Sequence, residues 1–205
     1  MDSYITIHHY ASFEYEDRKS IFIGDAMPVS TEDEALAFID TIKKRYPDAR
    51  HHVYAYVLRD NSIMRFTDDR EPQGTAGMPV LDVIRKNGIT DTVIVVTRYF
   101  GGTLLGTGGL VRAYTAAALG AVEKAEIITY DVYTTLNIET TYSDYQKFAP
   151  IFSELGYRSE DVRYTDKVVL NGSIRKACVE DLTDKLVQIT SGRVKVEIID
   201  EKFDF

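Results

Sequence analysis

The sequence predicts an α+β protein of 205 residues made of two units, and two observations lead to that prediction. Up to about residue 131, apolar runs that suit strands alternate with segments whose apolar residues recur every three or four positions, as on one face of a helix. From residue 132 onward the expected order is strand, helix, strand, strand, helix, strand, which is the ferredoxin-like βαββαβ pattern. No Pro-rich or Ser-rich linker separates the two stretches, so we expect domains at residues 1–131 and 132–205 with a tight junction.

The first unit is expected to alternate strands and helices. Strands are expected at residues 5–15, 20–28, 52–59, 62–66 and 92–97, and helices at residues 31–45, 78–86 and 108–124. Thr31 and Glu34 have the spacing of a capping box at the start of the first helix, and Pro47 stops that helix. Asp60-Asn61 suits a tight hairpin turn between the strands on either side of it.

The second unit is expected to open with a strand and a helix. Its strands are expected at residues 132–141, 157–164, 168–173 and 194–199, and its helices at residues 142–155 and 175–190. Apolar residues at helical spacing run up to Gly156, a common residue at a helix end. Because each unit has its own complete set of amphipathic elements, we expect fragments that end or start near Asp131 to fold separately.

Composition is that of a globular protein from a reducing compartment. Hydrophobic residues make up 44% of the sequence, which is enough for a packed core. No apolar stretch approaches the roughly 20 residues that a membrane span needs, and the first residues lack the pattern of an export signal. The one cysteine, Cys178, cannot form an internal disulfide and has the apolar neighbours of a core or half-buried thiol. We therefore expect a soluble cytoplasmic protein.

Charge argues against indiscriminate nucleic-acid binding. The formal net charge is −8, and both expected units are acidic. A surface that binds any phosphate backbone is basic, so a contact with nucleic acid has to be a local patch around residues such as Lys19, Arg98 and Arg112. Free duplex DNA is therefore not an expected partner.

The most informative segment is the glycine-rich stretch between the strand at residues 92–97 and the helix that follows. Five glycines fall within nine positions: Gly101, Gly102, Gly106, Gly108 and Gly109. Glycine is favoured where φ is positive or where backbones approach closely, so these residues predict a shaped loop. Such a loop at a helix N-terminus presents unpaired N–H groups and the positive end of the helix dipole, which attract an anion. Arg98 and Arg112 flank it with permanent positive charge.

Other interpretations of this segment stay open. It lacks the lysine of a P-loop and meets only two positions of the dinucleotide-binding glycine pattern, so neither nucleotide motif is predicted. The glycines can also serve only to let the Ala-rich helix pack closely. Arg98 can be an anion contact, in which case Arg98→Ala leaves stability nearly unchanged, or a buried ion-pair partner of Asp68 or Glu71.

Four motifs in the first unit belong together. They are Lys19-Ser20-Ile21-Phe22-Ile23, His51-His52-Val53-Tyr54-Ala55, the run from Asp68 to Pro79, and Arg98-Tyr99-Phe100-Gly101-Gly102 with the glycines and Arg112 that follow. This set resembles the IMPACT family, specifically its bacterial YigZ-type branch, over essentially the whole chain. The family usually has Gly at the position of Arg70, which leaves open the geometry of residues 68–72 and any role of Asp69 and Glu71.

The resemblance implies folds and a cellular process. The first unit is expected to be similar to the second domain of a small-subunit ribosomal protein, a fold also used by galactokinase-type kinases. The second unit is expected to be similar to domain V of elongation factor G. The family implies regulation of translation, which in eukaryotic members involves stress-kinase signalling; their N-terminal partner-binding domain has no counterpart in this sequence.

Several other side chains have both a structural and a chemical interpretation. The carboxylates of Asp68, Asp69 and Glu71 suit either a solvated turn or Mg²⁺, and we expect the turn. His51 and His52 lack the Cys or His partners of a zinc site, so a hydrogen-bonded structural role is favoured. Aromatic side chains can stack on unpaired bases, and near the loop Tyr99 or Phe100 is the candidate for that role.

These observations lead to one functional expectation and one alternative. The expected protein binds ribosome-linked RNA or a translation factor without catalysis, cofactor or metal. The alternative is an enzyme or sensor that binds a phosphorylated small molecule or nucleotide at the same loop. The expected anion- or nucleic-acid-binding residues are Lys19, Arg98, Tyr99, Gly101, Gly102, Gly106, Thr107, Gly108, Gly109 and Arg112.

Overall fold

The computed structural model describes residues 3–59 and 63–205, which divide into two compact units. One unit comprises residues 4–129, and the other comprises residues 130–205 with Ser3. Helices and strands are mixed in both units, so the structure confirms the α+β class that the sequence predicts. The hairpin turn expected at Asp60-Asn61 lies outside the described residues.

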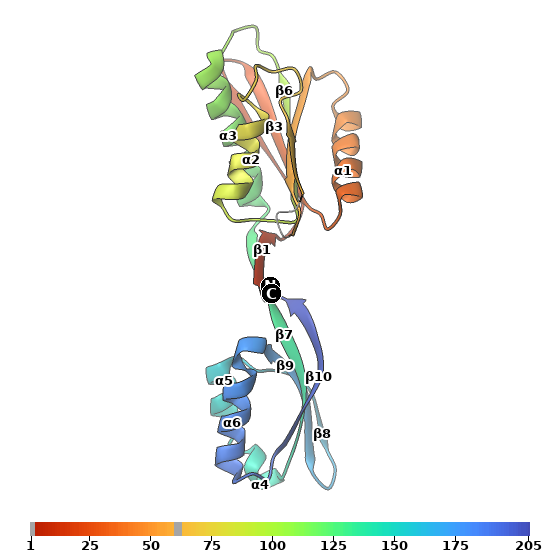
Figure 1. Ribbon diagram of the computed structural model, residues 1–205, viewed down its shortest axis with the longest axis vertical. Coiled ribbons are helices and arrows are strands. Elements are labelled where there is room, and N and C mark those ends of the chain that lie inside the picture. Colours follow the sequence, from red (N-terminus) through yellow and green to blue (C-terminus); the bar gives the residue numbers. More distant parts are fainter. Residues whose placement is uncertain (1–2, 60–62) are drawn as a thin grey trace. The chain divides into compact units, whose positions relative to one another are not determined.

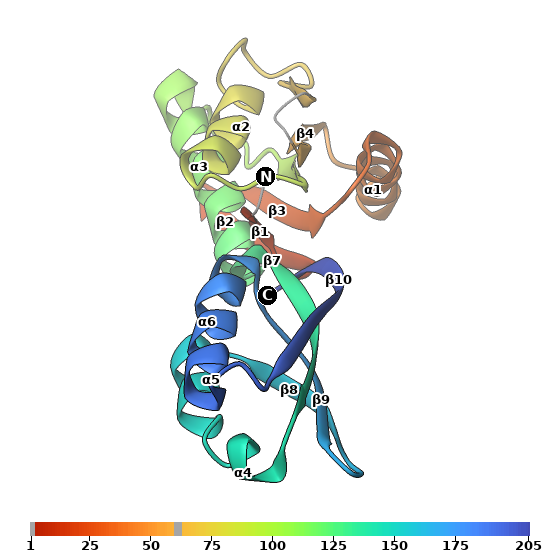
Figure 2. The same cartoon turned by 60° about the horizontal axis from the view of Figure 1, so that its bottom comes forward.

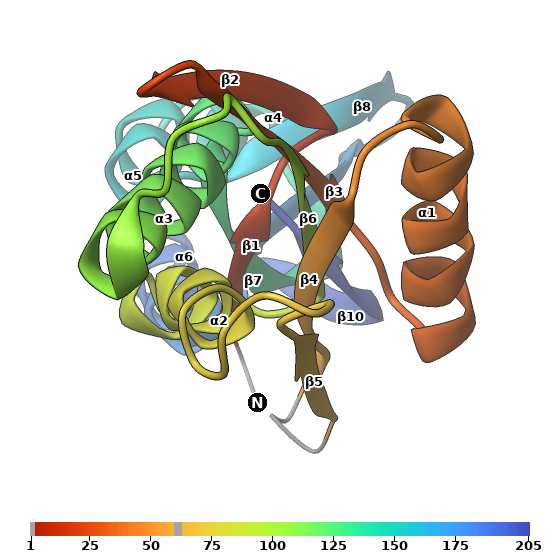
Figure 3. The ribbon, with the colours of Figure 1, turned by 90° about the horizontal axis from the view of Figure 1, so that it is seen from above.

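A five-stranded antiparallel sheet organises the unit of residues 4–129. Its strands follow the order β2 (Ala11–Asp17), β3 (Ser20–Pro28), β6 (Thr92–Tyr99), β4 (His51–Val57) and β5 (Met64–Thr67). Helix α1 (Glu32–Arg45) covers one face, and helices α2 (Gly77–Lys86) and α3 (Gly106–Lys124) cover the other (Figure 1, Figure 3). The sheet is therefore the middle layer of three.

Strand β6 is central in this sheet, which explains its apolar run from Val93 to Val96. Successive side chains of a strand point to opposite faces. Ile94 and Val96 accordingly join the core beneath α2 and α3, whereas Val93 and Val95 join the core beneath α1. A strand buried on both faces favours apolar side chains, and the polar residues of β6 stand toward its two ends.

Helix α3 packs on the sheet through small side chains. Ala113, Ala117 and Ala121 are fully buried in the core between the helix and the sheet. Opposite them stands Gly24 of β3, where an added Cβ would overlap the Ala117 carbonyl. The Ala-rich sequence thus brings the backbone of α3 directly against the backbone of β3.

The start of α1 confirms the predicted cap. Thr31 is its N-cap and its Oγ1 accepts a hydrogen bond from the N–H of Glu34 at 3.2 Å. The Glu34 carboxylate in turn accepts from the N–H of Ser30 at 2.6 Å. The helix ends at Arg45, before Pro47, as expected.

The single strand expected at residues 5–15 is wrong. Two strands stand in its place, β1 (Ser3–Ile7) and β2, and they belong to different sheets. The chain bends at His8 and His9, whose N–H groups donate to the carbonyls of Ala125 and Glu126. These long-range hydrogen bonds interrupt a sequence that by itself reads as one strand.

The unit of residues 130–205 has the ferredoxin-like arrangement. Its antiparallel strands follow the order β10 (Lys195–Asp204), β7 (Ile127–Thr140), β9 (Val168–Arg175) and β8 (Arg158–Tyr164). Helices α5 (Ala149–Leu155) and α6 (Val179–Thr190) pack on one face of this sheet (Figure 2). Cys178, at the end of the short 3-10 helix η2 (Lys176–Cys178), is half-buried against this core, as predicted.

The helix expected at residues 142–155 is broken in two. Helix α4 (Tyr142–Tyr145) precedes α5, and Pro150 stands in the first turn of α5. Proline has no N–H, and its ring clashes with the carbonyl four residues earlier, so it is accepted in a first turn and not in a helix interior. Helical spacing of apolar residues continues across this break, which is why the pattern alone predicts one helix.

The helices of the described residues include none that is both long and apolar enough to cross a membrane.

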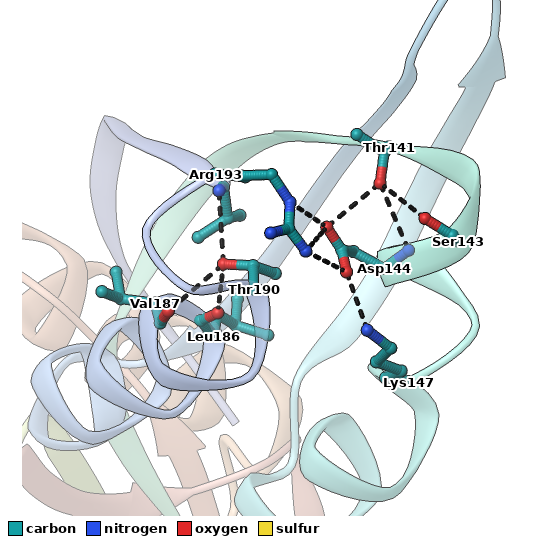
Figure 4. Close-up of polar contacts among 9 residues, drawn as sticks. Thr141, Ser143, Asp144, Lys147, Leu186, Val187, Thr190 and Arg193 are labelled. Atoms are coloured by element: carbon teal, nitrogen blue, oxygen red, sulfur yellow. Dashed lines mark hydrogen bonds and ion pairs between the residues drawn. The ribbon is translucent and has the colours of Figure 1, made fainter.

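A buried carboxylate joins α4 to the end of α6 in this second unit (Figure 4). Asp144 accepts hydrogen bonds from the Arg193 guanidinium at 2.9 to 3.0 Å and from Lys147 Nζ at 2.9 Å. Thr141, the N-cap of α4, completes the cluster through its hydroxyl. Lys147, followed by Arg193 and Thr141, lowers the pKa of Asp144 from its ordinary 3.8 to about 2.

Asp144→Asn is expected to lower the melting temperature of this unit at pH 7. A carboxylate with a depressed pKa stabilises the folded state above its ordinary pKa, and that contribution disappears as the pH falls from about 4 toward 2. The variant should therefore lose part of the acid-induced drop in melting temperature. Differential scanning calorimetry between pH 7 and pH 2 measures both effects. Asp184→Asn, at an exposed position of α6, is the control, and an equal response of the two variants would contradict the prediction.

Candidate functional site

The glycine-rich loop leads from the end of β6 into α3. Gly106, the first residue of α3, has a φ of +70°, which an L side chain adopts only with strain. No side chain caps this helix, and Gly106, Thr107 and Gly108 are exposed. The Arg112 guanidinium lies nearby, since a Cβ built on Gly108 would be 3.7 Å from its Nη1. Unpaired N–H groups, the helix dipole and a cation therefore meet at the start of α3.

A cavity of about 430 Å³ lies beside this loop. Its lining is mainly apolar, from Pro72, Phe100, Leu104, Leu105 and Leu110. Its polar lining comes from Arg50, His51, Glu71 and Arg98, together with Gly106 and Thr107 of the first turn of α3. Phe100 is 45% exposed, so the cavity offers an accessible aromatic ring. Pockets of about 300–1,000 Å³ with a few convergent polar groups are typical of sites for small organic ligands.

Glu71 is the centre of a buried polar network at this cavity. Arg98 Nη1 donates to Glu71 Oε1 at 2.6 Å, and the Tyr114 hydroxyl donates to the same oxygen at 2.8 Å. His51 Nε2 lies 3.9 Å from that oxygen. Burial, with the neighbouring Glu71 charge, raises the pKa of Tyr114 well above its ordinary 10, so Tyr114 remains a hydroxyl donor. The network joins the acidic turn to β4, β6 and α3.

Arg98 is a buried ion-pair partner. Its side chain is 7% exposed, and its guanidinium carbon lies 5.3 Å from the ring centroid of Phe22 and 5.6 Å from that of Phe100. Its pairing with Glu71 is the buried ion pair that the sequence leaves open as the alternative to an anion contact. Among the described residues Arg98 Nε has no acceptor, although nearly all buried donors in proteins have one. Because Arg98 lines the cavity, an acceptor atom of a bound ligand could accept a hydrogen bond from this unpartnered Nε.

The acidic turn at residues 68–72 is partly exposed, and two of its carboxylates accept hydrogen bonds from backbone N–H groups. Asp68 caps α2, since its carboxylate accepts the N–H groups of Gly74, Ala76 and Gly77 at 2.8 to 3.1 Å. Asp69 accepts the N–H of His52 at 2.6 Å. With Glu71 in the buried network, each of the three carboxylates has a structural partner.

Arg70 takes the backbone conformation that a glycine at its position would adopt. Its φ is +69°, in the left-handed region, which costs an L residue roughly 1–2 kcal/mol. Its guanidinium donates to the carbonyl of Arg50 at 2.7 Å. With Arg70 in place of the Gly that the resemblance implies, the turn still closes, and Arg70 is in a strained conformation.

The two adjacent histidines have different surroundings. His51 Nδ1 lies 2.7 Å from the carbonyl oxygen of Asp69, which requires a proton on Nδ1. His52 Nε2 donates to the carbonyl of Tyr46 at 3.0 Å, and burial lowers the pKa of His52 below its ordinary 6.5. His52 thus has the structural role that the sequence favours, whereas His51 also lines the cavity.

The predicted site residues do not all meet at the cavity. Arg98, Gly106 and Thr107 line it, and Gly108, Gly109 and Arg112 follow in the first turns of α3. Gly101 serves close packing, because an added Cβ would overlap the carbonyl of Lys19 in the β2–β3 turn. Gly102 is exposed with a φ of +86°.

Tyr99 lies on the other face of the sheet. It follows Arg98 on β6, so alternation turns its side chain toward the α1 layer. Burial raises its pKa, with smaller effects from Asp48 and Tyr46 beyond the end of α1. Of the two aromatic candidates for stacking, Phe100 alone lines the cavity.

Sequence comparisons assign both parts of the chain. Residues 18–122 match the profile described as the Impact N-terminal domain, and residues 138–193 match a domain of unknown function, DUF1949. The Bacillus subtilis protein "IMPACT family member YvyE" is 32% identical over 96% of this chain and 91% of its own length. The chain belongs to the IMPACT family. The Escherichia coli IMPACT family member YigZ is 33% identical over 91% of this chain and 93% of its own length.

Other relatives show how much of the chain each of them matches. A yeast protein, "Protein IMPACT homolog" of Saccharomyces cerevisiae, is 31% identical over 47% of this chain and 39% of its own length. A solved structure, "Crystal structure of an hypothetical protein", has 29% identity and a TM-score of 0.61, covering 98% of this chain and all of that one. The match to the IMPACT family therefore extends over both units, whereas the eukaryotic match covers about half of the chain.

Sequence reasoning missed part of the cavity beside the glycine-rich loop. Arg50, Pro72, Leu104 and Leu105 line it but are not among the predicted binding residues, and Tyr114 and Glu71 were not connected to each other. The apolar pair Leu104-Leu105 within a glycine-rich loop is the one signal that points to this cavity, because loops are seldom apolar without a function.

Proposed function

We propose that this protein binds single-stranded, ribosome-linked RNA at the cavity beside the glycine-rich loop, and that it acts in translation in the cytoplasm without catalysing a reaction. The observation that carries the proposal is the accessible ring of Phe100 in a cavity that adjoins the uncapped start of α3. Membership of the IMPACT family supports the link to translation, because eukaryotic proteins named IMPACT share the first unit.

Each part of a nucleotide has a matching surface at this site. A base is flat and largely apolar, and it suits a cavity with Phe100 and leucine side chains in its lining. Base edges carry acceptors, which suit the unpartnered Nε of Arg98. A phosphate suits the exposed N–H groups of Thr107 and Gly108 with Arg112 beside them.

Binding of this kind is weak and local. Because Arg98 is paired with Glu71, the net positive charge at the site comes from few side chains, among them Arg112. The logarithm of affinity should then fall with the logarithm of salt concentration by about 0.7 per phosphate neutralised on a single strand. A slope that indicates contact with eight or more phosphates would contradict the proposal that an acidic protein binds RNA through one small cationic patch.

A phosphorylated small molecule is the second candidate. It is favoured by the size of the cavity, which at about 430 Å³ holds one nucleotide-sized ligand. If the partner is a translation factor, binding requires that protein and does not require RNA. Titration with short oligoribonucleotides, mononucleotides and phosphorylated metabolites, beside ribosome co-sedimentation with and without ribonuclease, separates the three.

Phe100→Ala is expected to weaken RNA binding without unfolding the protein. Loss of one stacking platform costs about 1–3 kcal/mol, or roughly 5- to 150-fold in affinity. Phe66→Ala is the matched control, because Phe66 is 43% exposed against 45% for Phe100 and does not line the cavity. Fluorescence anisotropy with a labelled oligoribonucleotide measures both. Equal affinity of the two variants, or no RNA binding by the wild type, would overturn the proposal.

A further inference from the structure

Three metal-ligating side chains gather at the end of α3 that lies opposite to the glycine-rich loop. His8, His9 and Glu126 each offer a ligand atom, these atoms lie within 4.8 Å of one another, and all three residues are exposed. In the parts of the chain that the structure describes, no other group of three such residues meets this spacing. At 1.5 Å per residue, the 19 residues of α3 put this cluster about 28 Å from the start of the helix.

The backbone, and not chance rotamers alone, produces this arrangement. Adjacent residues of a strand point to opposite faces, but the bend at His8 and His9 brings their ring centroids to 5.4 Å. The N–H of His8 donates to the carbonyls of Ala125 and Glu126 at 3.0 and 2.8 Å, and the N–H of His9 donates to Ala125 at 3.2 Å. The histidines are thereby fixed opposite the turn that carries Glu126.

Glu126 itself has an unusual backbone conformation. Its φ is +59°, in the left-handed region that glycine or asparagine usually occupies. Such a residue persists only where its surroundings hold it, and residues of this kind are frequent at ligand sites. Here it places a carboxylate oxygen 3.7 Å from His8 Nδ1.

We propose that His8, His9 and Glu126 bind a divalent transition-metal ion, with Zn²⁺ as the best match. Two imidazoles and one carboxylate are a ligand set that zinc uses, with water in the fourth tetrahedral position. Zinc bonds of about 2.0–2.1 Å separate tetrahedral ligands by about 3.3 Å. The His8–Glu126 pair is at 3.7 Å and all three ligand atoms lie within 4.8 Å of one another, a gap that exposed side chains close by small rotations. Mg²⁺ and Ca²⁺ prefer oxygen ligands throughout, so they do not fit this set.

A metal here joins two segments that are distant in the sequence. It ties the bend after β1 to the turn between α3 and β7, both of which already exchange backbone hydrogen bonds. Because an ion that binds only the folded state shifts the folding equilibrium toward it, zinc should raise the melting temperature of the unit of residues 4–129.

Isothermal titration with ZnCl₂ tests the site in the full chain with Cys178→Ser, so that the one thiol does not contribute. The expected result is saturable binding of one ion, reversed by EDTA. His9→Gln removes a ligand and should weaken binding at least roughly tenfold, as loss of metal-site residues generally does. Glu123→Gln, which removes a carboxylate at an exposed position near the end of α3, should bind as the parent does. Absence of saturable binding, or equal affinity of the His9→Gln and Glu123→Gln proteins, overturns the proposal.

Discussion

Arg98→Ala is expected to lower the free energy of unfolding of residues 4–129 by about 3–5 kcal/mol. The truncation leaves the Glu71 carboxylate buried with only the Tyr114 hydroxyl at 2.8 Å and His51 at 3.9 Å. An uncompensated buried charge costs far more than an exposed one, because a buried carboxylate is poorly solvated. Since small proteins are stable by about 5–15 kcal/mol in total, a loss of this size should be obvious in a urea melt.

The controls for this prediction come from the same turn. Arg70→Ala removes a guanidinium that is 76% exposed and paired only at the surface, so its effect through charge should be small. Glu71→Gln with Arg98→Met removes both charges and should recover much of the stability that Arg98→Ala loses. A single Arg98→Ala protein that melts with the wild type would mean that the ion pair contributes nothing, and that Arg98 is available to an anion after all.

Gly101→Ala should have the second largest effect, about 1–3 kcal/mol of stability together with loss of ligand binding. The new Cβ would overlap the carbonyl of Lys19 and the N–H of Ser20. Both are backbone groups, so a change of side-chain rotamer cannot relieve the overlap. The β2–β3 turn would have to shift from the end of β6, which would also break the bond from Gly101 N–H to Ser20 Oγ at 3.1 Å. Phe100, the adjacent residue, would be displaced from the cavity.

Gly108→Ala is the matched substitution for this test. Gly108 has an ordinary helical φ, and its added Cβ would meet only Arg112 Nη1 at 3.7 Å, an ordinary contact. It should therefore keep wild-type stability or gain slightly from the helix propensity of alanine. Thermal melts of both variants measure the difference in stability, and RNA titrations compare Gly101→Ala with the wild type alone, because Gly108 belongs to the proposed phosphate site. Equal melting temperatures would contradict the close approach of Gly101 to Lys19.

Most of the fold could be predicted because it follows from local patterns. The Thr31 cap and the apolar run of β6 are each set by residues a few positions apart, and the structure has both. The errors occur where one residue, or a residue distant in the sequence, determines where a helix or strand ends. Pro150 divides a continuous helical pattern, and the carbonyls of Ala125 and Glu126 divide the strand expected at residues 5–15.

The candidate site was less predictable, because it depends on pairs that are far apart in the sequence. Glu71 and Arg98 are separated by 27 positions, and Glu71 and Tyr114 by 43, so no local spacing connects them. The sequence identifies the loop and the start of α3, whose signals are local. It does not show that Glu71 neutralises Arg98. That pairing leaves the start of α3, with Arg112, as the part of the site that attracts an anion.

The contact between Gly24 and Ala117 has a consequence for binding kinetics. With backbone against backbone at this point, α3 cannot slide or tilt over β3 without a clash, so its first turn stays at a fixed place relative to the end of β6. The site is therefore pre-organised, and a ligand loses little affinity to ordering the protein. Variants of the cavity should then change how fast a ligand leaves far more than how fast it arrives, since no slow rearrangement of the protein precedes its entry.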